Sequence, residues 1–210
     1  MIRPIMRKND FLNHWSRLHG NAPISGVVKA WLSISFIVAR VLCKLKISAN
    51  LLTISGLLFA ALLYLFGKEV WSPIFLVLSL MADGIDGSMA IISGKASKFG
   101  SLLDSVVDRI SEVLWVLVLY KIGIDQEVLL LIVIMAFIQE YLRGRSGGLG
   151  LTDIGIVTIA ERPVRASFVF IILIFFHLNF ANIIFIAYLW MIFQIVSIIT
   201  ITKYLRSKFR

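Results

Sequence analysis

Charged residues are scarce in this chain. They make up 16% of its 210 residues, against about a quarter in soluble proteins, whereas 59% are hydrophobic. The single cysteine, Cys43, excludes an internal disulfide framework. The apolar residues occur in runs of roughly twenty, the length at which a helix crosses about 30 Å of hydrocarbon. These properties exclude an ordinary soluble domain and predict an all-α, polytopic membrane protein.

The hydropathy pattern divides the chain into two parts. Residues 1–46 are expected to form amphipathic helices in the cytoplasmic interface, the first of them capped by Asp10. For the second, over 26–46, a membrane span is the alternative, because its basic residues are separated by apolar ones. Residues 47–210 are expected to form a transmembrane domain of six helices, at 48–67, 71–93, 100–122, 127–145, 164–178 and 181–203.

Basic residues are distributed unevenly between the two sides of these spans. If the N-terminus is cytoplasmic, all of the 21 lysines and arginines face the cytoplasm except Lys68, Lys121 and Arg109. The positive-inside rule therefore predicts an integral protein of the cell membrane with both termini on the cytoplasmic side. The net charge of +9 is explained by this topology, so no nucleic-acid partner is expected.

Four aspartates interrupt the apolar pattern of the second and third predicted spans. Asp83 and Asp86 are three residues apart, and Asp104 and Asp108 are four apart, so each pair shares a helix face. Because the link between the helices is short, the two pairs are expected to face each other at the cytoplasmic membrane surface. Converging carboxylates repel unless a cation is present, and all-oxygen ligand sets suit Mg²⁺ or Mn²⁺. The sequence therefore predicts a divalent-metal site of the kind that holds a phosphate or pyrophosphate.

The spacing of these aspartates also resembles a known signature. The segment Asp83-x-x-Asp86-Gly87-x-x-Ala90, followed by Gly100-x-x-x-Asp104-x-x-x-Asp108, is similar to D-x-x-D-G-x-x-A-R-x8-G-x-x-x-D-x-x-x-D of the CDP-alcohol phosphatidyltransferases. The stretch ISANLLTISG looks like the entry to the first span of that family. Every fixed position of the signature matches except one, where Ile91 stands in place of arginine.

The resemblance implies an enzyme of phospholipid biosynthesis that transfers a phosphatidyl group from CDP-diacylglycerol to an alcohol and releases CMP. All four aspartates would be metal ligands, with two ions expected, and Asp108 would also be the catalytic base for the alcohol hydroxyl. Lys95 and Lys98 would supply charge that Ile91 lacks. The residues expected to contact the nucleotide are Asp83, Gly87, Ala90, Lys95, Lys98 and Gly100. Members of the family are typically homodimers, which implies a homodimer here.

The longest cytoplasmic link bears on the identity of the acceptor alcohol. Arg143 and Arg145 precede its glycine-rich middle, and Arg162 and Arg165 follow it, next to Glu161. Two basic pairs suit an anionic acceptor, and this arrangement is similar to family members that use inositol phosphate or glycerol 3-phosphate. We therefore predict a phosphorylated polyol as acceptor. The alternative is that these arginines only anchor the topology beside anionic lipid.

Two other functions are compatible with the sequence. Ile91 would suit a catalytically impaired member of the family that acts as a partner subunit. The four carboxylates would suit a divalent-cation transporter, although the first, fifth and sixth predicted spans offer almost no polar residues to carry an ion across. Metal-dependent CMP release, compared with metal flux into liposomes, separates these functions.

Overall fold

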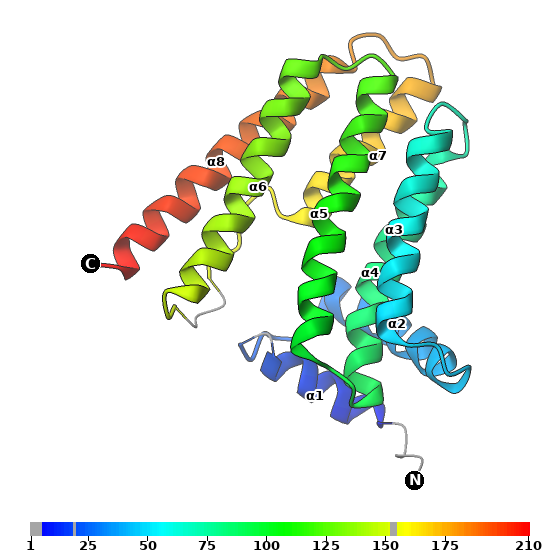
Figure 1. Ribbon diagram of the computed structural model, residues 1–210, viewed down its shortest axis with the longest axis vertical. Helices are drawn as coiled ribbons and strands as arrows, with labels where there is room; N and C mark the ends of the chain where they lie inside the picture. Colours follow the sequence, from blue (N-terminus) through cyan, green and yellow to red (C-terminus); the bar gives the residue numbers. More distant parts are fainter. Residues whose placement is uncertain (1–5, 19, 152–154) are drawn as a thin grey trace. The chain divides into compact units, whose positions relative to one another are not determined.

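The computed structural model describes residues 6–18, 20–151 and 155–210 (Figure 1). Residues 1–5 of the predicted interfacial segment and 152–154 of the long link lie outside them. The regular elements of the described residues are all helices: α1 Lys8–Leu18, α2 Gly26–Lys44, α3 Ala49–Phe66, α4 Ser72–Ser93, α5 Lys98–Lys121, α6 Gln126–Gly148, α7 Arg162–His177 and α8 Ile184–Lys208. The all-α prediction is confirmed, and helices α3 to α8 match the six predicted spans to within a few residues.

Four of these helices, α2, α3, α4 and α8, are long and apolar enough to cross a membrane. Helix α2 is the segment for which an interfacial position was expected, and its length and composition permit the alternative span. Helices α5 and α6 carry the charged residues of the predicted sites, and α7 has only 16 residues. The number of spans and the interfacial position of α1 and α2 therefore stay predictions.

Local signals set the ends of the helices near the aspartates. Helix α4 stops because Gly94 adopts a left-handed conformation with φ of 62°, for which glycine is favoured. Helix α5 starts after Ser97, whose Oγ accepts a hydrogen bond from Gly100 N at 3.0 Å, as an N-cap does. One local prediction is wrong: α1 begins at Lys8, so Asp10 lies in its first turn and not at the cap position.

The chain forms two compact units, of which unit 1 contains Met1–Ala60 and Val77–Ser111 and unit 2 contains Ala61–Leu76 and Glu112–Arg210. Unit 1 holds the four aspartates and all residues predicted to contact the nucleotide. Unit 2 holds the four arginines of the predicted acceptor site. The boundary predicted between residues 46 and 47 stays a prediction.

The apolar core of unit 1 joins α1 and α2 to α4. Its buried members are Phe11, Leu32, Phe36, Ala39, Ile85, Met89, Ile91 and Ile92. A side chain at Gly84 would have its Cβ 2.6 Å from Cζ2 of Trp31, so only glycine permits this approach of α2 to α4. Nearby, the hydroxyl groups of Ser35 and Ser88 form a buried hydrogen bond of 3.0 Å. One face of the aspartate-bearing helix α4 is therefore covered by α2.

The position at which the sequence departs from the signature belongs to this core. Ile91 is 7% exposed, so Ile91→Arg would place a charge among apolar side chains. We expect the free energy of unfolding to fall by several kcal/mol, on the order of 3–5, because an uncompensated buried charge is strongly destabilising. Thermal unfolding in detergent measures this effect. Ile91→Val is the control, with an expected loss of about 0.5–1.5 kcal/mol. Equal stability of the two variants would contradict this packing role of Ile91.

In unit 2, helices α6 and α8 lie side by side, and α7 also packs on α8 (Figure 1). Buried polar groups join these helices to the end of the α6–α7 link. Gln194 Nε2 donates to Gln139 Oε1 at 2.6 Å, and Gln139 Nε2 donates to Thr158 Oγ1 at 3.1 Å. The backbone N of Ala160 donates to Ser197 Oγ at 2.9 Å. The link therefore ends in a conformation that side chains of α6 and α8 hold in place.

Candidate metal and nucleotide site

Three of the four aspartates meet in unit 1. Carboxylate oxygens of Asp83 on α4 and of Asp104 and Asp108 on α5 all lie within 4.8 Å of one another, and all three residues are partly buried. Arg109 Nη2 lies 3.9 Å from Asp108 Oδ2. Because three carboxylates at this separation repel one another, the arrangement fits a divalent cation with oxygen ligands. The predicted convergence of the two helices at their aspartates is therefore present in the structure.

The fourth aspartate, Asp86, has a different environment. It is 5% exposed and accepts a hydrogen bond from the hydroxyl group of Thr53 on α3. Asp86 lies outside the group formed by the other three carboxylates, so its role as a metal ligand stays a prediction. Thr53 was not predicted as a site residue, although it is a hydroxyl residue in the ISANLLTISG stretch that carries part of the resemblance.

A cavity of about 90 Å³ opens beside these carboxylates. Predicted nucleotide residues that line it are Gly87, Ala90, Lys95 and Gly100, and they are joined by Asp86, Asp104 and Asn50. A Cβ at Gly87 would meet nothing within 4 Å, so Gly87 borders open space. At Gly100 a Cβ would lie 3.1 Å from Ser97 Oγ and 3.3 Å from Asn50 Oδ1, so a larger residue would be crowded. Asn50 was not predicted, and Asp83 and Lys98 do not line this cavity.

In unit 2, Arg165 is buried and paired with two carboxylates. It is 1% exposed. Its Nε donates to Glu112 Oε1 at 2.8 Å, its Nη2 donates to Glu140 Oε1 at 3.0 Å, and its Nη1 donates to the carbonyl O of Ala160 at 2.8 Å. Arg165 therefore joins α5, α6 and the α6–α7 link through one guanidinium group, a structural role that the sequence did not indicate.

Arg143 is also engaged by a carboxylate. Its guanidinium group binds both carboxylate oxygens of Glu161, with Nη1 donating to Oε2 at 2.7 Å and Nη2 to Oε1. Burial alone would raise the pKa of Glu161, but the hydrogen bonds from Arg143 and Thr158 lower the pKa overall. Of the other two predicted acceptor residues, Arg145 is exposed, and the guanidinium carbon of Arg162 lies 5.3 Å from the ring centre of Trp115.

A family profile described as CDP-alcohol phosphatidyltransferase matches residues 46–203. The chain belongs to this family. It is 33% identical to the archaetidylinositol phosphate synthase of Pyrococcus horikoshii over 147 residues. This aligned region covers 66% of this chain and 75% of the relative. It is 32% identical to the phosphatidylinositol phosphate synthase of Corynebacterium glutamicum over 162 residues, and this aligned region covers 70% of this chain and 69% of the relative. The resemblance seen in the sequence is therefore confirmed.

Solved structures share the fold. The phosphatidylinositol phosphate synthase of Mycobacterium tuberculosis with CDP-DAG bound gives a TM-score of 0.63 at 23% identity, over 83% of this chain and 92% of that one. The same enzyme in complex with manganese and citrate also gives 0.63, over 82% and 87%. As a CDP-alcohol phosphatidyltransferase, the chain is an enzyme of phospholipid synthesis, and the carboxylates of unit 1 carry the signature of its family.

Proposed function

We propose that this CDP-alcohol phosphatidyltransferase transfers the phosphatidyl group of CDP-diacylglycerol to an inositol phosphate and releases CMP. The observation that carries the proposal is the meeting of Asp83, Asp104 and Asp108 beside a cavity with small-residue walls. The names of the relatives in Pyrococcus and Corynebacterium favour inositol phosphate over glycerol 3-phosphate, the other acceptor expected from the sequence.

The three carboxylates of the metal site would hold Mg²⁺ or Mn²⁺, and Asp86 is the further ligand if two ions bind. A bound divalent ion supplies positive charge that neutralises the phosphate oxygens of the substrate. Asp108 accepts the proton of the acceptor hydroxyl group as that oxygen attacks the phosphorus of the lipid phosphate, and the bond from this phosphorus to the bridging oxygen of CMP breaks, so that CMP leaves. Thr53 holds the Asp86 carboxylate in one orientation. Gly87, Ala90 and Gly100 let the nucleotide approach the backbone closely.

The arginines at the end of α6 and the start of α7, on either side of the link, are the proposed binding residues for the acceptor phosphate. Arg145 is exposed and so accessible to an anion from solution, and Arg162 follows the link as the first residue of α7. Arg143 and Arg165 already bind carboxylates, so their contribution is to fix the shape of the link and to add positive charge.

For the topology we propose six spans, α3 to α8, after interfacial helices in 1–46, with both termini and the metal site cytoplasmic. The distribution of lysine and arginine supports this orientation, and the family match begins at residue 46, beside the proposed domain boundary. A homodimer is proposed from the family resemblance. Cross-linking of detergent-solubilised protein tests the dimer, and labelling of cysteines introduced near each terminus in sealed vesicles tests the orientation.

The reaction is tested by CMP release from CDP-diacylglycerol with purified protein. Inositol phosphate, glycerol 3-phosphate, free inositol and serine are supplied separately, with Mg²⁺ or Mn²⁺. We expect release with inositol phosphate, loss of release after EDTA, and recovery when Mn²⁺ is added back, because the ion is needed at the carboxylates. Release with only another acceptor contradicts the proposed substrate. Silence with every acceptor, while the protein still binds the CDP-lipid, contradicts the activity and favours the impaired partner subunit.

A further inference from the structure

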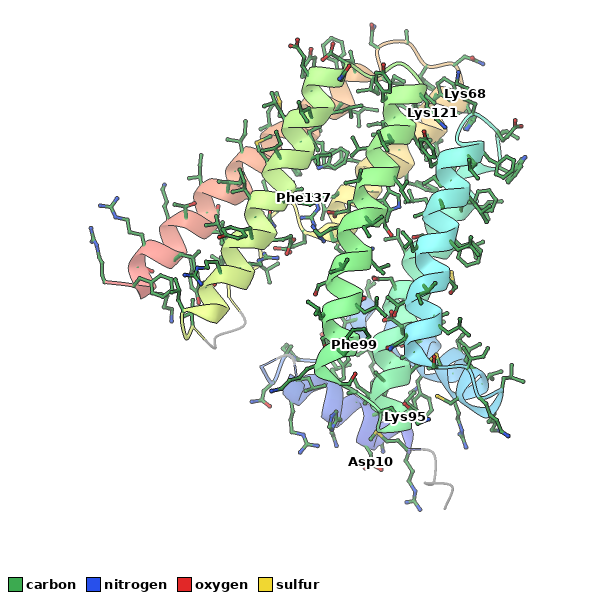
Figure 2. All side chains as sticks on the ribbon, viewed as in Figure 1. Asp10, Lys68, Lys95, Phe99, Lys121 and Phe137 are labelled. Atoms are coloured by element: carbon green, nitrogen blue, oxygen red, sulfur yellow. The ribbon has the colours of Figure 1, made fainter. Side chains whose placement is uncertain are left out.

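The chain turns back on itself where α4 ends. With Gly94 in the left-handed conformation, Gly94 N donates to the carbonyl O of Ile91 at 3.1 Å. Lys95 N donates to the carbonyl O of Ala90, also at 3.1 Å. These two bonds form the Schellman turn that commonly ends a helix. As a result, the residue after the turn is brought back beside Ala90, a wall residue of the cavity (Figure 2 shows Lys95 near the end of α4).

Lys95 has a distinctive charge among the residues of this cavity. The lining contains the carboxylates of Asp86 and Asp104, hydroxyl groups and small residues. Among the described residues that line it, Lys95 is the only lysine or arginine. Its side chain is exposed, so a ligand that enters from solution meets the ammonium group without having to displace protein atoms.

Helix α4 itself brings no cation to the cavity. Ala90 lines the cavity, whereas the next residue, Ile91, is buried in the apolar core with α1 and α2. Successive residues of an α-helix point about 100° apart, so Ala90 and Ile91 lie on different sides of α4. Among the described residues that line the cavity, the basic side chain for an anionic ligand therefore comes from the turn that follows the helix, where Lys95 lies.

We infer that Lys95 binds a phosphate of the CDP group and supplies there the charge that the family signature places at the position of Ile91. The inference rests on the proposed function, because it takes the cavity as the nucleotide site. It assigns the role to Lys95 and not to Lys98, which does not line the cavity. A lysine ammonium is a point charge on a flexible stem and not a bidentate fork, so it attracts the phosphate without fixing its orientation.

Steady-state kinetics and equilibrium binding of CDP in the presence of Mn²⁺ test the inference. For Lys95→Ala we expect the KM for CDP-diacylglycerol and the Kd for CDP to rise about tenfold, the effect of one charge-assisted contact. The KM for the acceptor should change less than about twofold, and Lys95→Arg should keep most of the affinity. Because the contact is ionic and exposed, raising the salt concentration should weaken CDP binding more in the wild type than in Lys95→Ala.

Two comparisons distinguish Lys95 from other basic residues of unit 1. Lys44→Ala, at an exposed lysine in the last turn of α2, is the matched control and should leave both constants unchanged. Lys98→Ala should have a clearly smaller effect than Lys95→Ala. Equal effects of the two alanine variants, or an unchanged Kd for CDP in Lys95→Ala, would overturn the inference.

The turn provides an independent test that leaves the lysine in place. At position 94, which has the left-handed conformation, asparagine is tolerated, whereas the β-branched valine is strained. The two variants to compare are therefore Gly94→Asn and Gly94→Val. We expect Gly94→Val to raise the Kd for CDP and Gly94→Asn to keep it near the wild-type value. Similar affinities in both variants would count against the role of the turn. Failure of the proposed function has a different signature, since the wild type would then release no CMP although CDP binding could still be compared.

Discussion

Asp108→Asn is expected to lower the rate of CMP release about a thousandfold or more. Asparagine has nearly the same shape as aspartate, but it carries no charge and cannot accept the proton of the acceptor hydroxyl group. Loss of a general base alone typically lowers the rate 10²- to 10⁴-fold, and Asp108 also belongs to the group of three carboxylates within 4.8 Å. The rate is measured with saturating CDP-diacylglycerol and inositol phosphate in the presence of Mn²⁺.

The matched control for this variant is Asp125→Asn. Asp125 caps α6, accepting hydrogen bonds from Glu127 N at 2.9 Å and Val128 N at 3.1 Å. Asparagine is an equally good cap, so we expect wild-type activity. Mn²⁺ binding, measured in parallel, should weaken in Asp108→Asn and stay unchanged in the control. If Asp108→Asn keeps even a tenth of the wild-type rate, Asp108 is not the base.

Arg165→Met is expected to produce a large loss of stability, about 3–5 kcal/mol in the free energy of unfolding. Methionine fills part of the same volume, but it leaves the Glu112 carboxylate, whose side chain is 8% exposed, without the guanidinium group 2.8 Å away. It also removes the hydrogen bonds to Glu140 and to the carbonyl O of Ala160. Thermal unfolding in detergent measures the loss.

A double variant separates the structural role of Arg165 from a role in acceptor binding. Adding Glu112→Gln to Arg165→Met removes the uncompensated carboxylate, so part of the lost stability should return. Arg145→Met, at an exposed arginine in the last turn of α6, should leave stability unchanged while raising the KM for inositol phosphate. If Arg165→Met unfolds like the wild type and only raises that KM, the ion pair is not what holds the link.

The helices and the metal site were predictable because their signals are local. Apolar runs give the positions of α3 to α8, since a long apolar run between short polar links predicts one helix. The pair Asp104 and Asp108 shares a face because four residues make about one helical turn, and a short link brings Asp83 back toward them. Local reasoning failed at Asp10, which lies inside the first turn of α1, because helix starts are uncertain by one or two residues.

Other parts of the site depend on packing that no local pattern encodes. The partners of Arg165 come from α5 and α6, 53 and 25 residues away in sequence, so only the packed bundle determines whether it binds protein or ligand. Thr53 is similar, since its hydroxyl group reaches Asp86 from another helix. Ile91 shows the limit of a signature: the sequence records a missing arginine, whereas the structure shows an apolar residue that packs against α1 and α2.

Arg165 also bears on how the chain is made. A guanidinium group that is inserted alone into a hydrophobic environment is costly, so the first turn of α7 can be buried only when Glu112 and Glu140 are already in place. Both carboxylates belong to helices that precede α7 in the chain, and synthesis delivers them first. The carboxylates that pair with Arg165 are therefore synthesised before it, and a ribosome-bound chain truncated after α6 would still lack the cation that binds Glu112 and Glu140 together.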